Sequence, residues 1–172
     1  MFLLVIGGAA SGKSQYAEAF VTRLSGPRLY IATMQPFDDE CRARIQKHRA
    51  MRKDKGFDTL ECYTNLAEAA AQVPPGSNVL LECMSNLIAN ELYSPEGKGA
   101  DAALRGIDLL LPRCNNLTVV TNEVFSGGAE YAGDTLFYLK ELSRVNRALA
   151  ARADTAAEII CGCANILKGK EL

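Results

Sequence analysis

Eight residues near the N-terminus have the types and the spacing of a phosphate-binding loop. They read Gly-Gly-Ala-Ala-Ser-Gly-Lys-Ser directly after the apolar run 2–6, and they match the pattern G-x-x-x-x-G-K-S/T. The glycines let backbone N–H groups turn toward phosphate oxygens, and a helix that begins near Gly12 adds the positive end of its dipole. Lys13 would reach the β- and γ-phosphates, and the Ser14 hydroxyl would ligate Mg²⁺.

A glycine-rich turn without a ligand is the alternative interpretation of this loop. The pattern is complete and lies between a predicted strand and a predicted helix, which favours a site for a nucleoside triphosphate. The loop positions are Gly7, Gly8, Ala9, Ala10, Ser11, Gly12, Lys13 and Ser14.

The only histidine of the chain, His48, lies in a segment rich in arginine and lysine. Residues 38–53 begin with acidic residues and end with basic ones, which predicts a helix whose charges suit its dipole. A solvated basic helix explains this pattern, and the residues alone favour that interpretation. The alternative is a neutral imidazole that attacks a phosphorus atom whose oxygens are held by Lys47, Arg49 and Arg52. Nearby positive charge keeps an imidazole unprotonated, and therefore nucleophilic.

Two glutamates follow apolar runs that predict buried strands. Glu82 comes directly after residues 79–81, and proteins with this loop place an acidic partner of Mg²⁺ at the end of a neighbouring strand. A strand-end cap is the alternative, and the apolar run favours the metal role. Glu123 ends another predicted strand, and a structural and a functional role are equally open for it. Ser14 and Glu82 are therefore the predicted magnesium ligands.

Short apolar runs suited to buried parallel strands alternate with helical patterns along the chain. This predicts an α/β fold of the P-loop NTPase type, with a mostly parallel sheet and helices on both faces. Ligands of such sheets gather at the carboxyl ends of the strands, where the phosphate loop lies. A helix with an apolar stripe from Leu139 to Leu149 is predicted to have Asp134 as its N-cap. The expected strands are Phe2–Ile6, Leu29–Ala32, Thr59–Tyr63, Val79–Leu81, Leu117–Thr121 and Glu158–Cys161.

Two segments have the composition of connections. Tyr93–Gly99 is expected to be a flexible surface connection. Val124–Gly133 contains three glycines and follows a predicted strand end, so it is either a substrate loop or a long turn.

Length and composition restrict the class of protein. A chain of 172 residues is expected to form one domain, residues 1–172, and its 48% hydrophobic and 23% charged content is ordinary for a globular protein. The net charge of −1 gives no support to binding of nucleic acid or of a membrane surface. No apolar run approaches the roughly 20 residues that span a bilayer, and no leader is recognisable, so a cytoplasmic protein is expected.

The six cysteines do not form a metal-binding pattern. The only closely spaced pair, Cys161 and Cys163, lacks the second pair of ligands that a zinc site needs. Most of the cysteines are expected to be small, buried and reduced side chains.

Several stretches beyond the phosphate loop resemble a known family. The chain is similar to the bifunctional adenosylcobinamide kinase / adenosylcobinamide-phosphate guanylyltransferases of cobalamin assembly. The loop itself occurs in many nucleotide-binding proteins, but Tyr-Ile-Ala-Thr followed by Asp-Asp-Glu and a helix with histidine and arginine is far more specific. The matching stretches are 7–14, 30–35, 38–49, 80–83, 119–124 and 144–150, in the family's order over nearly the whole chain.

The resemblance implies two reactions at one P-loop domain. ATP or GTP phosphorylates the aminopropanol hydroxyl of adenosylcobinamide. GTP then transfers GMP to the family's helix histidine, which matches His48, and the GMP passes to adenosylcobinamide phosphate to give adenosylcobinamide-GDP. The resemblance also implies a corrinoid as small-molecule partner and a homotrimer. The family's nucleotide contacts match the 7–14 loop, Ala32, Thr33, Met34, Arg49, Ala50, Met51, Arg52, Glu61 and Glu82.

The chain departs from the family's pattern at Ala10, where arginine is common, and over residues 125–131, from which no substrate contact is transferred.

Two other classes of function are open from the residues. A plain P-loop kinase of small molecules needs the loop and an acid but no histidine. A GTP-dependent regulatory module is disfavoured, because the sequence lacks the Asn-Lys-x-Asp motif that reads guanine.

Overall fold

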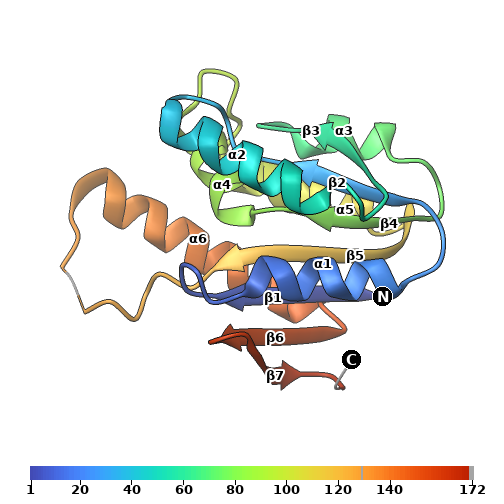
Figure 1. Ribbon diagram of the computed structural model, residues 1–172. Helices are drawn as coiled ribbons and strands as arrows, with labels where there is room; N and C mark the ends of the chain where they lie inside the picture. The colour runs from blue at the N-terminus through green and yellow to red at the C-terminus, as the bar shows by residue number, and fades with distance from the viewer. Residues whose placement is uncertain (129, 171–172) are drawn as a thin grey trace.

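The computed structural model describes residues 1–128 and 130–170 and shows an α/β protein built on a seven-stranded sheet (Figure 1). The backbone of Met51 belongs to a helix, but its side chain lies outside the described residues, as does Ala129. The strands are β1 (Phe2–Gly7), β2 (Arg28–Ala32), β3 (Phe57–Glu61), β4 (Ser77–Leu81), β5 (Cys114–Asn122), β6 (Thr155–Ile160) and β7 (Cys163–Lys168). The helices are α1 (Lys13–Arg23), α2 (Asp39–Arg52), α3 (Leu66–Gln72), α4 (Met84–Tyr93), α5 (Ala100–Leu110) and α6 (Gly133–Arg152).

The strands follow the order β3-β2-β4-β5-β1-β6-β7, and neighbouring strands are parallel except for β6 and β7. β1 lies between β5 and β6, and Gly7 at its carboxyl end stands opposite Asn122 of β5. Because parallel strands end at the same edge of a sheet, the phosphate loop and the residues after β2, β4 and β5 meet there. The predicted fold class, a mostly parallel P-loop NTPase-like sheet, is confirmed.

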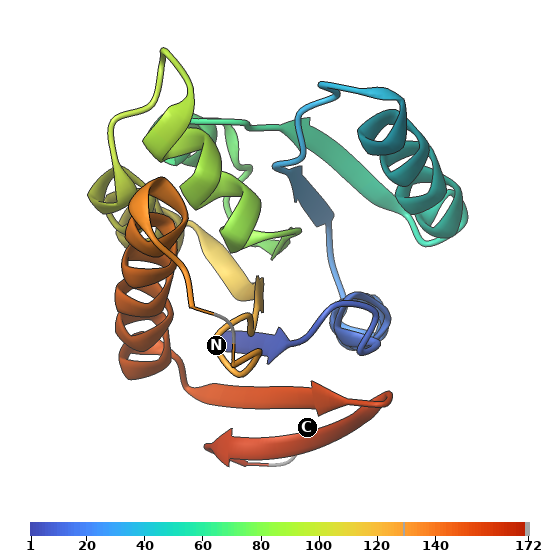
Figure 2. The same cartoon turned by 90° about the vertical axis from the view of Figure 1, so that its left-hand side faces the viewer.

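Helices cover both faces of the sheet, as predicted, with α1 and α2 on one side and α4 and α6 on the other (Figure 2). Successive side chains of a strand point to opposite faces, and β1 shows this alternation. Phe2 and Leu4 join a large core with residues of α3, α4, α5 and α6. Leu3 and Val5 join a smaller core with Phe20 and its neighbours on α1. Both clusters hold β1 rigidly beneath the phosphate loop.

All six expected strands are present, most of them with an earlier start than expected, and one further strand was not predicted. β3 covers Phe57–Glu61 rather than Thr59–Tyr63: the N–H of Cys62 still bonds to the carbonyl of Ala32, and the chain bends at Tyr63. β7 was not predicted, because its side chains are mostly exposed and lack a buried apolar pattern. A two-residue turn with positive φ at Cys161 and Gly162 joins it to β6, and such turns favour tight antiparallel hairpins.

The longest helix begins differently from the prediction. Ala132 is the N-cap of α6, and Asp134 lies inside the first turn, so the prediction of Asp134 as N-cap is wrong. Its carboxylate still lies at the positive end of the helix dipole, where negative charge is favourable. Within the described residues, neither α6 nor any other helix is long and apolar enough to cross a bilayer.

The connection after α4 lies on the surface, as expected, and hydrogen bonds attach it to the rest of the protein. Tyr93 is the last residue of α4, and residues 94–99 follow. The buried carboxylate of Glu91 accepts hydrogen bonds from the N–H of Lys98 at 2.8 Å and from the N–H of Asn65 at 2.7 Å. This carboxylate therefore fixes the connection to the start of α3.

The cysteines are all free, but the prediction that most of them are buried is wrong. Cys62 is buried, whereas Cys161 and Cys163 are exposed at the hairpin between β6 and β7. Turn geometry and edge-strand position, which apolar patterning does not reveal, decide their exposure.

Close packing of α3 on α5 gives a stability prediction at Gly106. A Cβ at this position would come within 2.5 Å of the Leu66 Cβ, so Gly106→Ala forces the two helices apart. We expect the free energy of unfolding, measured by urea denaturation, to fall by about 1–3 kcal/mol. Arg105→Ala on the exposed side of the same helix is the control, with an expected change within about 0.5 kcal/mol. Equal stability of the two variants would contradict the packing argument.

Candidate functional site

The phosphate loop is held in shape by contacts of its own backbone and by the β6–β7 hairpin. Gly12, the N-cap of α1, has a φ of 94°, in the left-handed region that favours glycine. A Cβ on Gly12 would also come within 3.1 Å of the Cα of Gly162. The carbonyl of Ser11 accepts a hydrogen bond from the N–H of Gly162 at 2.8 Å. Lys13 folds over the loop, and its Nζ donates to the carbonyl of Gly8 at 2.9 Å.

A cavity of about 380 Å³ opens in front of this loop, and we call it the phosphate cavity. Three cationic side chains line it, Lys13 from the loop and Arg44 and Lys47 from α2. Burial lowers the pKa of Lys13, and the charge of Arg44 adds to this effect. Because three cations and a helix N-terminus converge, the cavity suits an anionic ligand.

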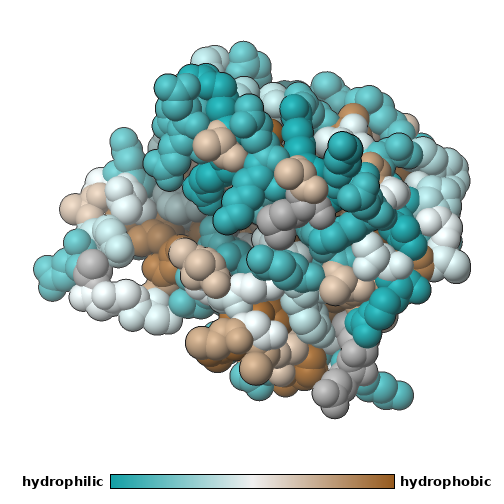
Figure 3. All heavy atoms as spheres, viewed as in Figure 1, coloured by the Kyte–Doolittle hydropathy of each residue, from teal (hydrophilic) through white to brown (hydrophobic). Residues whose placement is uncertain are grey.

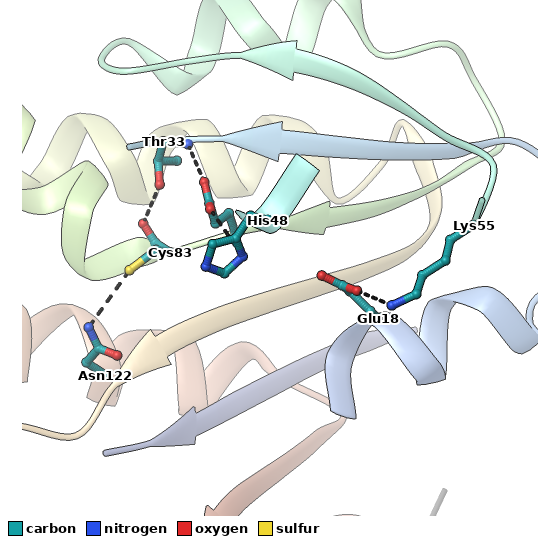
Figure 4. Close-up of polar contacts among 7 residues, drawn as sticks. Glu18, Thr33, His48, Lys55, Cys83 and Asn122 are labelled. Atoms are coloured by element: carbon teal, nitrogen blue, oxygen red, sulfur yellow. Dashed lines mark hydrogen bonds and ion pairs between the residues drawn. The ribbon is translucent and has the colours of Figure 1, made fainter. Parts of the chain in front are cut away.

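Helix α2 brings the single histidine to this cavity. Asp38 is its N-cap, and the carboxylate accepts a hydrogen bond from the N–H of Cys41 at 2.7 Å. This hydrogen bond holds the pKa of Asp38 below its usual value. Acidic residues follow in the first turn and basic residues in the last, so the predicted helix and its charge arrangement are confirmed. Figure 4 shows His48 of this helix close to Thr33 and Cys83, which follow the ends of β2 and β4.

The imidazole of His48 lies between two cavities and lines both of them. Its Nδ1 is 3.9 Å from Oε1 of Glu82, which is an ion-pair separation and too long for a hydrogen bond. The carboxylate of Glu82 also accepts a hydrogen bond from the N–H of Thr33 at 3.2 Å. The side chain of His48 is 22% exposed and that of Glu82 only 7%. An accessible imidazole therefore stands beside a fixed carboxylate.

The second cavity, of about 290 Å³, lies between α2 and the ends of β2, β3 and β4, and we call it the distal cavity. Glu61 accepts hydrogen bonds from Arg49 at 2.6 Å and from the hydroxyl of Tyr63 at 2.9 Å. Burial, followed by this hydrogen bond, raises the pKa of Tyr63. The lining residues are Ala32, Met34, Pro36, Arg42, Ile45, Gln46, His48, Arg49, Arg52, Glu61, Tyr63 and Glu82.

Most of the predicted nucleotide contacts fall into two groups on either side of His48. Ala9–Ser14 line the phosphate cavity, above Gly7 and Gly8 at the start of the loop. Thr33 is buried, and its hydroxyl donates to the carbonyl of Cys83 at 2.9 Å, which gives that side chain a structural role. Ala50 is exposed on α2, and the side chain of Met51 lies outside the described residues. The distal group is Ala32, Met34, Arg49, Arg52, Glu61 and Glu82.

The structure separates the basic residues that the sequence assigned together to one phosphate. Lys47 lines the phosphate cavity, where Arg44 joins it. Arg49 instead pairs with Glu61, and the guanidinium of Arg52 lies 3.4 Å from the centre of the Tyr30 ring. The prediction that Lys47, Arg49 and Arg52 hold the same phosphate is therefore wrong. Helical spacing alone does not show on which side of the imidazole each side chain lies.

The two predicted magnesium ligands lie near each other. Ser14 and Glu82 line a common small hollow between α1 and the sheet. β4, which precedes Glu82, is not a direct neighbour of β1, because β5 lies between them, and this corrects the expected strand position. Hydroxyl and carboxylate oxygens suit Mg²⁺, which takes its remaining ligands from water and phosphate. The described residues hold no group of three or more His, Cys, Asp or Glu arranged for a metal.

Glu123 takes the structural role that the sequence left open. Its carboxylate accepts a hydrogen bond from the N–H of Phe125 at 2.9 Å and so shapes the turn after β5. Sequence reasoning missed Asn122 in the phosphate cavity and Tyr63 in the distal cavity. Asn122 ends β5, and Tyr63 follows β3 by two residues, so the rule that ligands gather at carboxyl ends of parallel strands points to both.

The chain is similar to known proteins along almost its whole length. Residues 3–167 match the family model described as cobinamide kinase / cobinamide phosphate guanyltransferase. The bifunctional adenosylcobalamin biosynthesis protein CobU of Salmonella typhimurium is 36% identical over 178 residues, which cover 94% of this chain and 97% of that protein. CobU of Escherichia coli is 34% identical with the same coverage, and CobP of Pseudomonas aeruginosa is 29% identical over 98% of both chains.

Proposed function

The chain belongs to the cobinamide kinase / cobinamide phosphate guanyltransferase family, and from this premise we propose that it catalyses both reactions at the site around His48. The first reaction phosphorylates the hydroxyl of adenosylcobinamide with a nucleoside triphosphate. The second transfers GMP from GTP to the phosphate just made, by way of a GMP bound to the histidine. The observation that carries the proposal is the position of the imidazole, which lines both the phosphate cavity and the distal cavity.

The two cavities together suit an extended nucleoside triphosphate. In this proposal the β- and γ-phosphates lie on the loop, beside Lys13, Arg44 and Lys47. The α-phosphorus lies next to His48, and the base and sugar occupy the distal cavity. There, the carboxylate of Glu61 is available to accept hydrogen bonds from the N–H groups of guanine.

The transfer of GMP divides into two displacements at one phosphorus atom. The Nε2 lone pair of His48 forms a bond to the α-phosphorus while the bond to the bridging oxygen breaks, and pyrophosphate leaves. Glu82, 3.9 Å from Nδ1, stabilises the positive charge that the ring acquires. A phosphate oxygen of the second substrate then attacks the same phosphorus, the N–P bond breaks, and the imidazole is restored.

The first reaction uses the same loop without the histidine. The substrate hydroxyl attacks the γ-phosphorus, and the nucleoside diphosphate leaves as the proton of the hydroxyl is lost to water or a base. Lys13 and the backbone N–H groups of the loop hold the transferred phosphoryl group. Mg²⁺, held by Ser14 and Glu82 in this proposal, supplies charge neutralisation on the phosphates when it is bound.

Labelled GTP tests the proposed function directly. The wild-type protein, incubated with GTP labelled at the α-phosphate, is expected to retain label that is stable in alkali and lost in acid, as for a phosphorus–nitrogen bond. Mass spectrometry is expected to find one GMP on the peptide that contains His48. GTP labelled at the γ-phosphate is the control and leaves no label. A folded, kinase-active protein without α-label would point to a kinase that lacks the second reaction.

A further inference from the structure

Among the described side chains of helix α2, polar contacts rather than a buried apolar stripe attach the helix to the protein. Among its described side chains only Arg52, 6% exposed, is buried. The space-filling view shows hydrophilic residues over this helix (Figure 3). A helix without a buried apolar stripe gains little from burial, so individual polar contacts decide where it lies.

Two of these contacts lie at the C-terminal end of α2 and just beyond it. The guanidinium of Arg52 stacks on the ring of Tyr30 in β2. The Nζ of Lys55, in the turn after the helix, donates to Oε2 of Glu18 at 2.5 Å (Figure 4). The N–H of Lys55 bonds to the carbonyl of Arg52 at 2.9 Å, so the lysine is fixed to the last turn of the helix.

The partner of Lys55 is an unusual residue for its position. The side chain of Glu18 is 1% exposed, and its other oxygen, Oε1, has no hydrogen-bond partner among the described residues. A carboxylate buried to this degree is costly without a cation, so Lys55 is strongly held. Glu18 lies four residues after Ser14 on α1, the helix that begins at the phosphate loop. The ion pair therefore joins the helix of the loop to the helix of the histidine.

We propose that Glu18 and Lys55 are positioning residues for the transfer of GMP to His48. Their ion pair fixes the end of α2 relative to the phosphate loop, and His48 lies about one helical turn before the end of α2 at Arg52 and seven residues before Lys55. Attack on phosphorus requires the imidazole within about 3.5 Å and in line, and a displacement of about 1 Å costs on the order of 100-fold in rate. This inference rests on the proposed function of His48.

The kinase reaction should depend far less on this ion pair. It does not use the imidazole, and Arg44 and Lys47 reach the phosphates with long side chains that can follow a small displacement of the helix. The ratio of the rate of His48 labelling to the rate of the kinase reaction therefore distinguishes a positioning role from a general loss of structure.

Single-turnover labelling at saturating GTP tests the proposal. We expect Lys55→Met and Glu18→Gln to slow the labelling of His48 by about 10- to 100-fold and the kinase reaction by less than about threefold. Lys55→Arg, which keeps charge and reach, should restore most of the labelling. Lys53→Met, which removes an exposed lysine from the same turn, is the matched control and should label at the wild-type rate. In the double variant Glu18→Gln/Lys55→Met, the labelling of His48 should be no slower than in the slower of the two single variants. The double variant leaves no buried carboxylate without a cation, so it replaces Lys55→Met if that single variant does not fold.

Hydrogen exchange gives a readout that does not depend on activity. Amides of residues 42–52 are expected to exchange faster in the double variant than in the wild type or Lys53→Met, with β1 and β5 unchanged. Unchanged exchange in α2, labelling at the wild-type rate, or an equal loss of both reactions would overturn the positioning role. A wild type that takes no label would instead contradict the proposed function, while the exchange rates still decide whether the pair fixes α2.

Discussion

His48→Ala is expected to abolish the covalent attachment of GMP while the phosphorylation of adenosylcobinamide continues. The imidazole is the only group of its kind in the chain, and it lines both cavities of the site. In the proposed function the imidazole is the nucleophile that attacks the α-phosphorus, so without it labelling from GTP should fall by at least about 1,000-fold. The kinase rate, measured by transfer of the γ-phosphate, should change by less than about threefold.

His48→Asn is the matched variant for this experiment. Asparagine keeps a polar group near Glu82 but supplies no nucleophile, so it should lose the label as completely as alanine does. Retained label in either variant would place the attachment on another residue. A parallel loss of the kinase reaction in both variants would show that the histidine serves nucleotide binding in general.

Lys13→Ala is expected to impair both reactions together. Lys13 lines the phosphate cavity, where, in the proposed function, the γ-phosphate is transferred in one reaction and the β- and γ-phosphates leave together as pyrophosphate in the other. Removing a cation that stabilises charge on these oxygens should lower both rates by about 100- to 1,000-fold. The measurements are the same two assays, with γ-labelled and α-labelled nucleotide.

Lys140→Ala is the control for the loss of one positive charge, because this lysine is exposed on α6. It should leave both rates unchanged. A Lys13 variant that loses only one reaction would mean that the two reactions use separate triphosphate sites. Together, the His48 and Lys13 variants separate a shared phosphate site from a histidine that serves one reaction.

Local sequence patterns were sufficient for much of the fold. The alternation of apolar runs and helical patterns predicted a parallel sheet, and the spacing of Gly7, Gly12, Lys13 and Ser14 predicted the turn that crosses its edge. Both predictions depend only on residues that are close together in the chain, because local residue types favour a particular local backbone geometry. β7 was not predicted, because an exposed edge strand has no buried apolar pattern in its sequence. The trimer, the single domain and the cytoplasmic location stay predictions.

What the sequence determined about the site was its inventory: a phosphate loop, one histidine on a basic helix, and glutamates at strand ends. Only the tertiary structure decided which residues line which cavity. Arg44 and Lys47 line the phosphate cavity on one side of His48, and Arg49 and Arg52 line the distal cavity on the other. The contact between Glu18 and Lys55, 37 residues apart in the chain, likewise depends on how α1 and α2 lie on one face of the sheet. Such arrangements are set by long-range packing, in which each residue's position depends on many distant ones, and spacing within one helix or strand carries no information about it.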